Sequence, residues 1–152
     1  MDFILYLALN NKLLTRDRLA QWMQIGDLRC MLCKAMPETI EHLFFECIIS
    51  TTIWKKILQW QGLVRQPMAW QIEKEWAKKQ GKGKSAEAQI YRMALAATIY
   101  AIWIERNMRM FQGKSKPTMS IVRHIIQEQS DRDRSNRGDE EAGLGPSVQT
   151  VL

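Results

Sequence analysis

Apolar residues recur every three or four positions along most of the chain, and this spacing predicts helices rather than strands. After a short first helix within FILYLALNNKLL, Thr15 is a good N-cap for a second helix, which carries Trp22 on its apolar side. Thr39 can cap a third helix, and Ser50 is expected to open a fourth, which ends at Gly62.

The second half of the chain is also helical in pattern. Trp70 and Trp76 anchor one predicted helix, and GKGKS at 81–85 is the clearest internal linker. The longest helix is predicted over 86–111, and a last one begins at Thr118. We expect the buried face of the longest helix to comprise Ile90, Met93, Ala97, Tyr100, Ile104, Met108 and Phe111.

The composition changes at Asp131. The last 22 residues mix both charges with glycine and proline and contain no aromatic residue, which is typical of a disordered tail. The sequence therefore predicts an all-α fold: a small helical domain with a long central helix and a disordered C-terminal tail.

The composition indicates in which cellular compartment the protein is expected. No apolar run approaches the ~18 residues that span a bilayer, so we expect no membrane segment. The apolar start contains Asp2 and lacks an early basic region, which argues against a secretory signal. Three cysteines cannot all pair internally. We therefore expect an intracellular protein of a reducing compartment, nuclear or cytoplasmic and not secreted.

The net charge of +6 is unevenly distributed. Residues 55–84 carry eight Lys or Arg against two Glu, whereas residues 131–152 carry three Arg against five acids. Such a field attracts polyanions, nucleic acid first among them. The alternative is that the charge only keeps the protein soluble.

All three cysteines lie within 18 residues, in CMLCKAMPETIEHLFFEC. Their spacing with one histidine is Cys-x2-Cys-x8-His-x4-Cys, which predicts Cys30, Cys33, His42 and Cys47 as zinc ligands. His42 and Cys47 are about 140° apart on an ideal helix, so the helix must loosen or end between them. The alternative is a set of buried free cysteines with a core histidine.

Three thiolates and a neutral imidazole would close the site around Zn²⁺ with net charge −1, which indicates a structural role. Other chemistry is poorly supported. A Cys33–His42 nucleophile would leave two cysteines unexplained, and phosphate-binding and serine-nucleophile motifs are absent from the sequence. We therefore expect no enzymatic activity and no small-molecule substrate. His124 is expected to be an ordinary helix-surface residue.

The strings LALNNKLLTRDRLAQW, CMLCKAMPETIEHLFFEC and IWKKIL, in this order, resemble the zinc-binding region at the C-terminal end of plant LINE-type (non-LTR) retrotransposon reverse transcriptases. The resemblance is strong over residues 3–60 and looser over 95–127, where IWIERNMRMF resembles an Ile-Trp-x-Glu-Arg-Asn segment of the same elements. No polymerase motif is present, so a gene fragment or remnant is expected.

The leading hypothesis is a structural-zinc module that binds RNA or DNA through contacts to the phosphate backbone, and the resemblance adds a reverse transcriptase of the parent element as a possible protein partner. A zinc-stapled protein-interaction domain, presenting Trp103, Met108 and Met110, and a non-functional remnant are the alternatives. Trp22 and Trp54 could stack on bases, but their apolar faces favour the core. Candidate phosphate contacts are Arg16, Arg18, Arg29, Lys34, Lys55, Lys56, Lys78 and Lys79.

Four segments are therefore expected. They are a zinc-binding helical region organised by a knuckle-like loop (1–62), a basic helix with linker (63–85), the long helix plus the final helix packing on the core (86–130), and the disordered tail (131–152).

Overall fold

The computed structural model describes residues 2–63 and 68–143, and within these ranges every regular element is helical, which confirms the all-α prediction. The elements are α1 (Asp2–Leu9), α2 (Arg16–Leu19), the π-helical turn η1 (His42–Glu46), α3 (Ile48–Trp60), α4 (Trp70–Gly81), α5 (Ala86–Asn107), the π-helical turn η2 (Met108–Gln112) and α6 (Thr118–Gly143). No helix among the described residues has both the length and the apolar character to cross a membrane.

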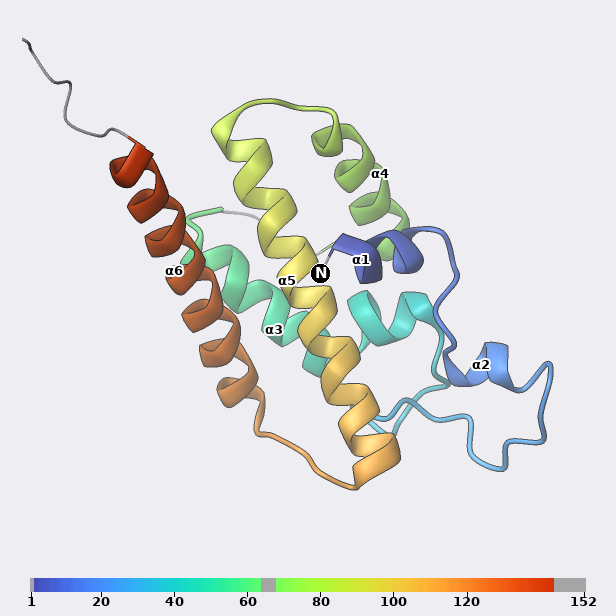
Figure 1. Cartoon of the computed structure of the whole chain (residues 1–152). Helices are drawn as coiled ribbons and strands as arrows, with labels where there is room; N and C mark the ends of the chain where they lie inside the picture. The colour runs from blue at the N-terminus through green and yellow to red at the C-terminus, as the bar shows by residue number, and fades with distance from the viewer. Residues whose placement is uncertain (1, 64–67, 144–152) are drawn as a thin grey trace, which may run out of the picture.

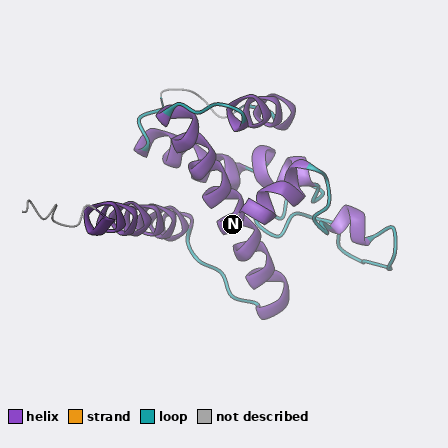
Figure 2. Cartoon of the chain, turned by 45° about the horizontal axis from the view of Figure 1, so that its top comes forward, coloured by secondary structure: helices purple, strands orange, loops and turns teal. Residues whose placement is uncertain are grey.

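The long helix α5 is the central rod of the fold (Figure 1). It packs against α1, α3, α4 and α6, and the turns at its C-terminal end lie beside the loop that follows α2. Figure 2 shows α6 on one side of α5 and the loop after α2 projecting on the other. Residues from α3, α5, α6 and the region of η1 share one apolar core.

The expected buried face of α5 is only partly confirmed: Ala97 is buried as predicted, but other positions are not. Ile90 and Ile104 are 39% and 42% exposed, while Tyr91 and Leu95 are buried together with Glu105. The helix is covered on several sides, so small and polar residues line much of its buried surface, and a count of large apolar positions misses them.

The last helix also departs from expectation. α6 continues through residues 131–143, where a disordered tail was predicted to begin, and residues 144–152 lie outside the described part of the chain. Ile125 packs in the core, but positions 131–138 are all exposed. Opposite charges three or four apart, such as Asp133 and Arg137, favour a solvent-exposed helix even without an apolar face.

Candidate metal centre

The structure gathers the four predicted ligands into one cluster. One donor atom from each of Cys30, Cys33, His42 and Cys47 lies within 4.8 Å of the others. The Sγ atoms of Cys30 and Cys47 are 4.0 Å apart, and Cys33 Sγ is 3.2 Å from His42 Nε2. A tetrahedral zinc site with bonds of ~2.3 Å has edges of about 3.8 Å, so the donor set fits this ion.

A π-helical turn places His42 and Cys47 on the same side, although they are five residues apart. The Cys47 N–H donates to the His42 carbonyl over 2.7 Å, an i→i+5 bond that brings both residues to one side of the turn. Thr39 Oγ1 accepts from the His42 N–H, as its predicted capping position requires. Cys47 then adopts an extended conformation and precedes α3. The helix is therefore widened over η1 and interrupted at Cys47.

The predicted cap at Ser50 is wrong. α3 already begins at Ile48, and Ser50 is buried within its first turns, where its hydroxyl donates to the Leu43 carbonyl. This bond ties α3 back to η1. Ser50 therefore helps to fix the position of the widened turn rather than to start the helix.

Backbone N–H groups point at the sulfur atoms. Leu32 N–H donates to Cys30 Sγ over 3.4 Å, and Ala35 N–H donates to Cys33 Sγ over 3.5 Å. Such bonds favour the thiolate form, which is the form that binds metal. The pKa of Cys47 is lowered to about 5 because the Cys30 thiol donates to it, with further help from backbone N–H groups, and the pKa of Cys30 is raised correspondingly.

Lys34 closes the turn between the first two cysteines in a left-handed conformation. Its φ is 59°, and its N–H donates to the Cys30 carbonyl over 3.0 Å. A side chain in this region costs about 1–2 kcal/mol relative to right-handed backbone, a cost that glycine avoids.

Lys34→Gly should therefore be more stable than Lys34→Ala by about 1 kcal/mol, because both variants lose the charge but only alanine keeps the Cβ. Denaturant unfolding at saturating zinc measures the difference. Equal stability of the two variants would show that the turn opens in solution.

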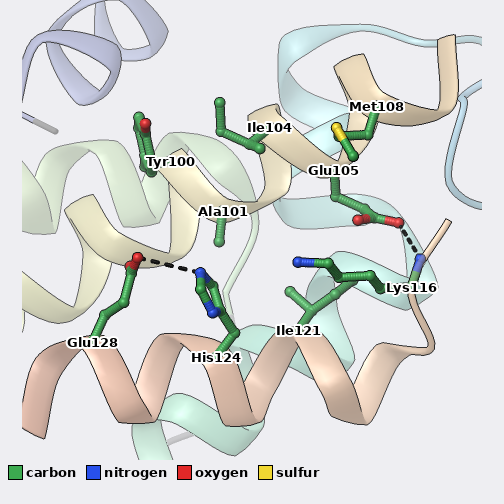
Figure 3. A pocket seen from close by; sticks show the side chains of 9 residues that line it. All are labelled: Tyr100, Ala101, Ile104, Glu105, Met108, Lys116, Ile121, His124 and Glu128. Carbon is green, nitrogen blue, oxygen red and sulfur yellow. Dashed lines mark hydrogen bonds and ion pairs between the residues drawn. The ribbon is translucent and has the colours of Figure 1, made fainter. Parts of the chain in front are cut away.

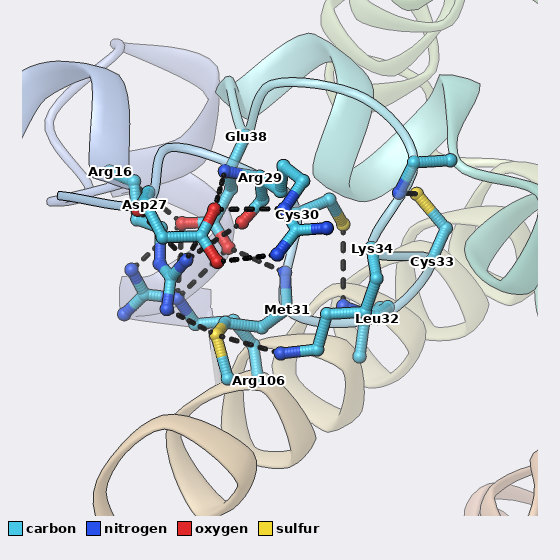
Figure 4. A network of polar contacts seen from close by, with 11 residues as sticks. Arg16, Asp27, Arg29, Cys30, Met31, Leu32, Cys33, Lys34, Glu38 and Arg106 are labelled. Atoms are coloured by element: carbon cyan, nitrogen blue, oxygen red, sulfur yellow. Dashed lines mark hydrogen bonds and ion pairs between the residues drawn. The ribbon is translucent and has the colours of Figure 1, made fainter.

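A buried ion pair between Glu38 and Arg106 lies next to the segment that carries Cys30 and Cys33 (Figure 4). The Glu38 carboxylate is fully buried and accepts from the Arg106 guanidinium over 2.8 Å, from Arg16 N–H over 3.0 Å and from Met31 N–H over 3.3 Å. Sequence reasoning missed both charged partners. The resemblance around residues 102–111 marked the Arg106 segment, but nothing in the periodicity links it to Glu38.

The candidate phosphate contacts on α2 and beside the first two cysteines, Arg16, Arg18, Arg29 and Lys34, differ in their partners and in their exposure to solvent. Arg16 donates to the Asp27 and Arg29 carbonyls, and the Arg29 guanidinium pairs with the Asp27 carboxylate over 3.0 Å. The hydrogen bond from Arg29 holds the pKa of Asp27 well below its usual range. Arg18 lines a polar hollow shared with acidic side chains, whereas Lys34 is exposed. Arg16 therefore serves mainly to hold the loop.

The other candidate contacts lie on different helices. Lys55 and Lys56 are exposed on α3, and Lys78 and Lys79 are exposed in the last turns of α4. Four of the eight candidates thus lie on α2 or next to the first two cysteines, and the other four lie on α3 and α4, which Figure 1 locates. Cations near a helix C-terminus also favour the helix itself, which is an alternative role for the α4 pair.

The tryptophans divide between surface and core. Trp54 is 1% exposed, as its apolar face predicted, but Trp22 is 79% exposed and the core prediction is wrong for it. α2 ends at Leu19 and the chain turns, so the helical spacing that would have buried Trp22 is interrupted. Trp103 contacts Phe44 and the Arg106 guanidinium, with a centroid distance of 4.8 Å to the latter.

A small hollow of about 90 Å³ lies between α5 and α6 (Figure 3). Tyr100, Ile104 and Met108 contribute apolar surface from α5 and η2, and His124 Nε2 lies 3.2 Å from Glu128 Oε1 at its edge. His124 is an exposed residue of α6, as expected, and is not part of the cysteine–histidine cluster. The hollow is large enough for one side chain.

Residues 1–54 match the model of a family described as zinc-binding in reverse transcriptase. The match includes all four residues of the metal cluster and covers about a third of the chain. Neither a curated protein nor a solved structure matches the chain. The family description and the donor set agree on zinc as the metal that this region fits.

Proposed function

We propose that the chain is a structural-zinc module of retroelement origin that binds RNA or DNA as an accessory to a reverse transcriptase and has no catalysis of its own. The observation that carries the zinc role is the set of four converging donors within the family match. Four protein ligands would fill a tetrahedral ion and leave no position for a reactive water, which favours a structural role. The resemblance to plant LINE-type elements supports the origin.

Nucleic-acid binding rests on charge and on one exposed aromatic side chain. The net charge is +6, and lysines on α3 and α4 are open to solvent. Trp22 lies in the turns after α2 with 79% of its surface exposed, so it can stack on an unpaired base. Phosphate contacts would supply affinity that tolerates different sequences and weakens with salt.

Trp22→Ala should weaken binding of a single-stranded RNA oligonucleotide by about 1–3 kcal/mol, the usual value of one base–aromatic stack. Fluorescence anisotropy at about 50 mM and 200 mM salt measures affinity and its salt slope. Phe111→Ala is the matched control, because Phe111 is a similarly exposed aromatic side chain (71%) that lies on η2 and not in the segment after α2. A wild-type protein without affinity at the lower salt would contradict nucleic-acid binding.

A protein-interaction module is the second candidate, and one observation favours it. Several large apolar side chains around the loop after α2 are exposed, namely Leu14, Trp22, Met23, Leu28 and Met36. Exposed aromatic and methionine side chains are enriched at protein interfaces. Loss of partner capture in Met23→Ser, with RNA affinity unchanged, would separate this function from base stacking.

A further inference from the structure

The loop that carries the first two metal ligands is docked onto α5 through buried charge. The side chains of Glu38 and Arg106 are 0% and 2% exposed, and two nitrogen atoms of the guanidinium contact the carboxylate. The same guanidinium donates to the Leu14 carbonyl over 3.4 Å and to Asn107 Oδ1 over 2.9 Å. Arg106 thus binds side-chain and backbone groups on both sides of α2.

Glu38 links the docked position of the loop to the metal ligand Cys30 through hydrogen bonds to the backbone. Its carboxylate accepts from the Met31 N–H, next to Cys30, and its own N–H donates to the Leu28 carbonyl over 2.8 Å. Cys30 N–H in turn donates to the Met36 carbonyl over 2.7 Å, so the two sides of the loop are cross-linked. The position of Cys30 therefore depends on where Glu38 is held.

A second arginine, which follows α5, contacts the backbone between Cys30 and Cys33. Arg109 donates to the Leu32 carbonyl over 3.2 Å, at a residue between the first two cysteines. Glu105 orients it through an ion pair of 3.0 Å and also accepts from the Lys116 N–H. The segment Glu105–Arg109 thus contacts the loop at two points.

We propose that Glu38, Arg106 and Arg109 are positioning residues of the metal centre, and that metal binding and the docking of this loop on α5 are one coupled equilibrium. The proposal rests on zinc binding by the four-residue cluster. Glu38 is buried against its counter-charge only when the loop is docked, and the docked loop is the one in which the four donors converge. By reciprocity, docking strengthens metal binding by the same factor by which metal binding strengthens docking, so a variant whose loop is largely undocked should bind metal more weakly.

The set of residues that holds the metal ligands in place therefore extends beyond the region of the family match. The match ends at residue 54, whereas the guanidinium that completes the interior of the loop comes from residue 106. The looser resemblance over IWIERNMRMF acquires a physical role, because Glu105 orients Arg109, Arg106 neutralises Glu38, and Asn107 holds Arg106.

The test measures zinc affinity of the full chain by competition with a chromophoric chelator. Arg106→Met should bind zinc about 10–100-fold more weakly, as expected for the loss of a group that holds a ligand-bearing segment in place. Ile125→Ala is the control, because it removes a buried side chain on α6, which packs against α3 and α5 and carries none of the four donors. This control should retain zinc affinity within about threefold while it lowers the melting temperature.

Arg109→Met is a second variant for this test, and it keeps the buried Glu38–Arg106 ion pair and hence the fold. It should weaken zinc binding several-fold. Cobalt-loaded Arg109→Met should retain the absorption of a tetrahedral three-thiolate site. Wild-type affinity in both arginine variants would overturn the proposal, and so would an equal loss of affinity in Ile125→Ala. A wild-type chain that binds no zinc would instead overturn the proposed function.

Discussion

His42→Asn is expected to remove most of the stability that zinc contributes, whereas His124→Asn should behave like the wild type. The chain has only these two histidines, and the structure places one in the metal cluster and the other on the exposed side of α6. They form a matched pair with the same chemical change. Their comparison isolates ligation from any general effect of losing an imidazole.

The expected effect is large because a metal that binds only the folded chain contributes its binding free energy to folding. Structural zinc sites bind the metal with a free energy of about 10–16 kcal/mol at neutral pH, and a site that has lost one of its four ligands should keep only a small part of this contribution to folding. Denaturant unfolding with saturating zinc, and again with excess chelator, measures this cost. The chelator should lower wild-type and His124→Asn stability strongly and His42→Asn stability little.

Cys33→Ser should reproduce the loss, because the hydroxyl that replaces Cys33 Sγ is a poor zinc ligand at neutral pH. If His42→Asn and Cys33→Ser both unfolded like the wild type in the presence of zinc, the four-ligand assignment would be wrong. Native mass spectrometry of the same samples counts the bound metal directly.

Arg106→Met should lower the free energy of unfolding by about 3–5 kcal/mol, the usual cost of leaving a buried charge without its partner. Glu38 is fully buried, so it cannot recover its hydration while the loop stays docked. The variant also removes donors from the Leu14 carbonyl and Asn107. Arg123→Met, an exposed substitution on α6, is the control and should be close to neutral.

The double variant Glu38→Gln with Arg106→Met separates the charge from the packing. Glutamine carries no charge and keeps an acceptor for one of the two N–H groups, since Arg16 and Met31 donate to different oxygens of Glu38. The double variant should therefore be more stable than Arg106→Met alone. A cost of less than about 1 kcal/mol in Arg106→Met would show that water replaces the guanidinium beside Glu38.

Local spacing explains why the metal cluster could be predicted. The four ligands fall within 18 residues, and the chemistry of zinc needs only those residue types at that separation. The required break between His42 and Cys47 also followed from helix geometry. Its form did not, because a π-helical turn and an interrupted helix satisfy the same requirement.

Long-range contacts explain what could not be predicted. Glu38 and Arg106 are 68 residues apart, and each belongs to a residue type that is usually exposed. The buried face of α5 was only partly predicted for a related reason, since four helices cover it and alanine, threonine and charged residues share its buried surface. Trp22 was assigned to the core because helical spacing gives no sign that α2 stops at Leu19.

The distance along the chain between Glu38 and Arg106 has a consequence for synthesis. Ribosomes add about 5–20 residues per second, so a separation of 68 residues corresponds to roughly 3–14 s. All four metal ligands emerge before that interval ends, while the partner of Glu38 is still untranslated. During those seconds the nascent loop lacks the guanidinium that neutralises Glu38, so the proposed coupling predicts weaker metal binding until Arg106 is made and the loop can dock on α5.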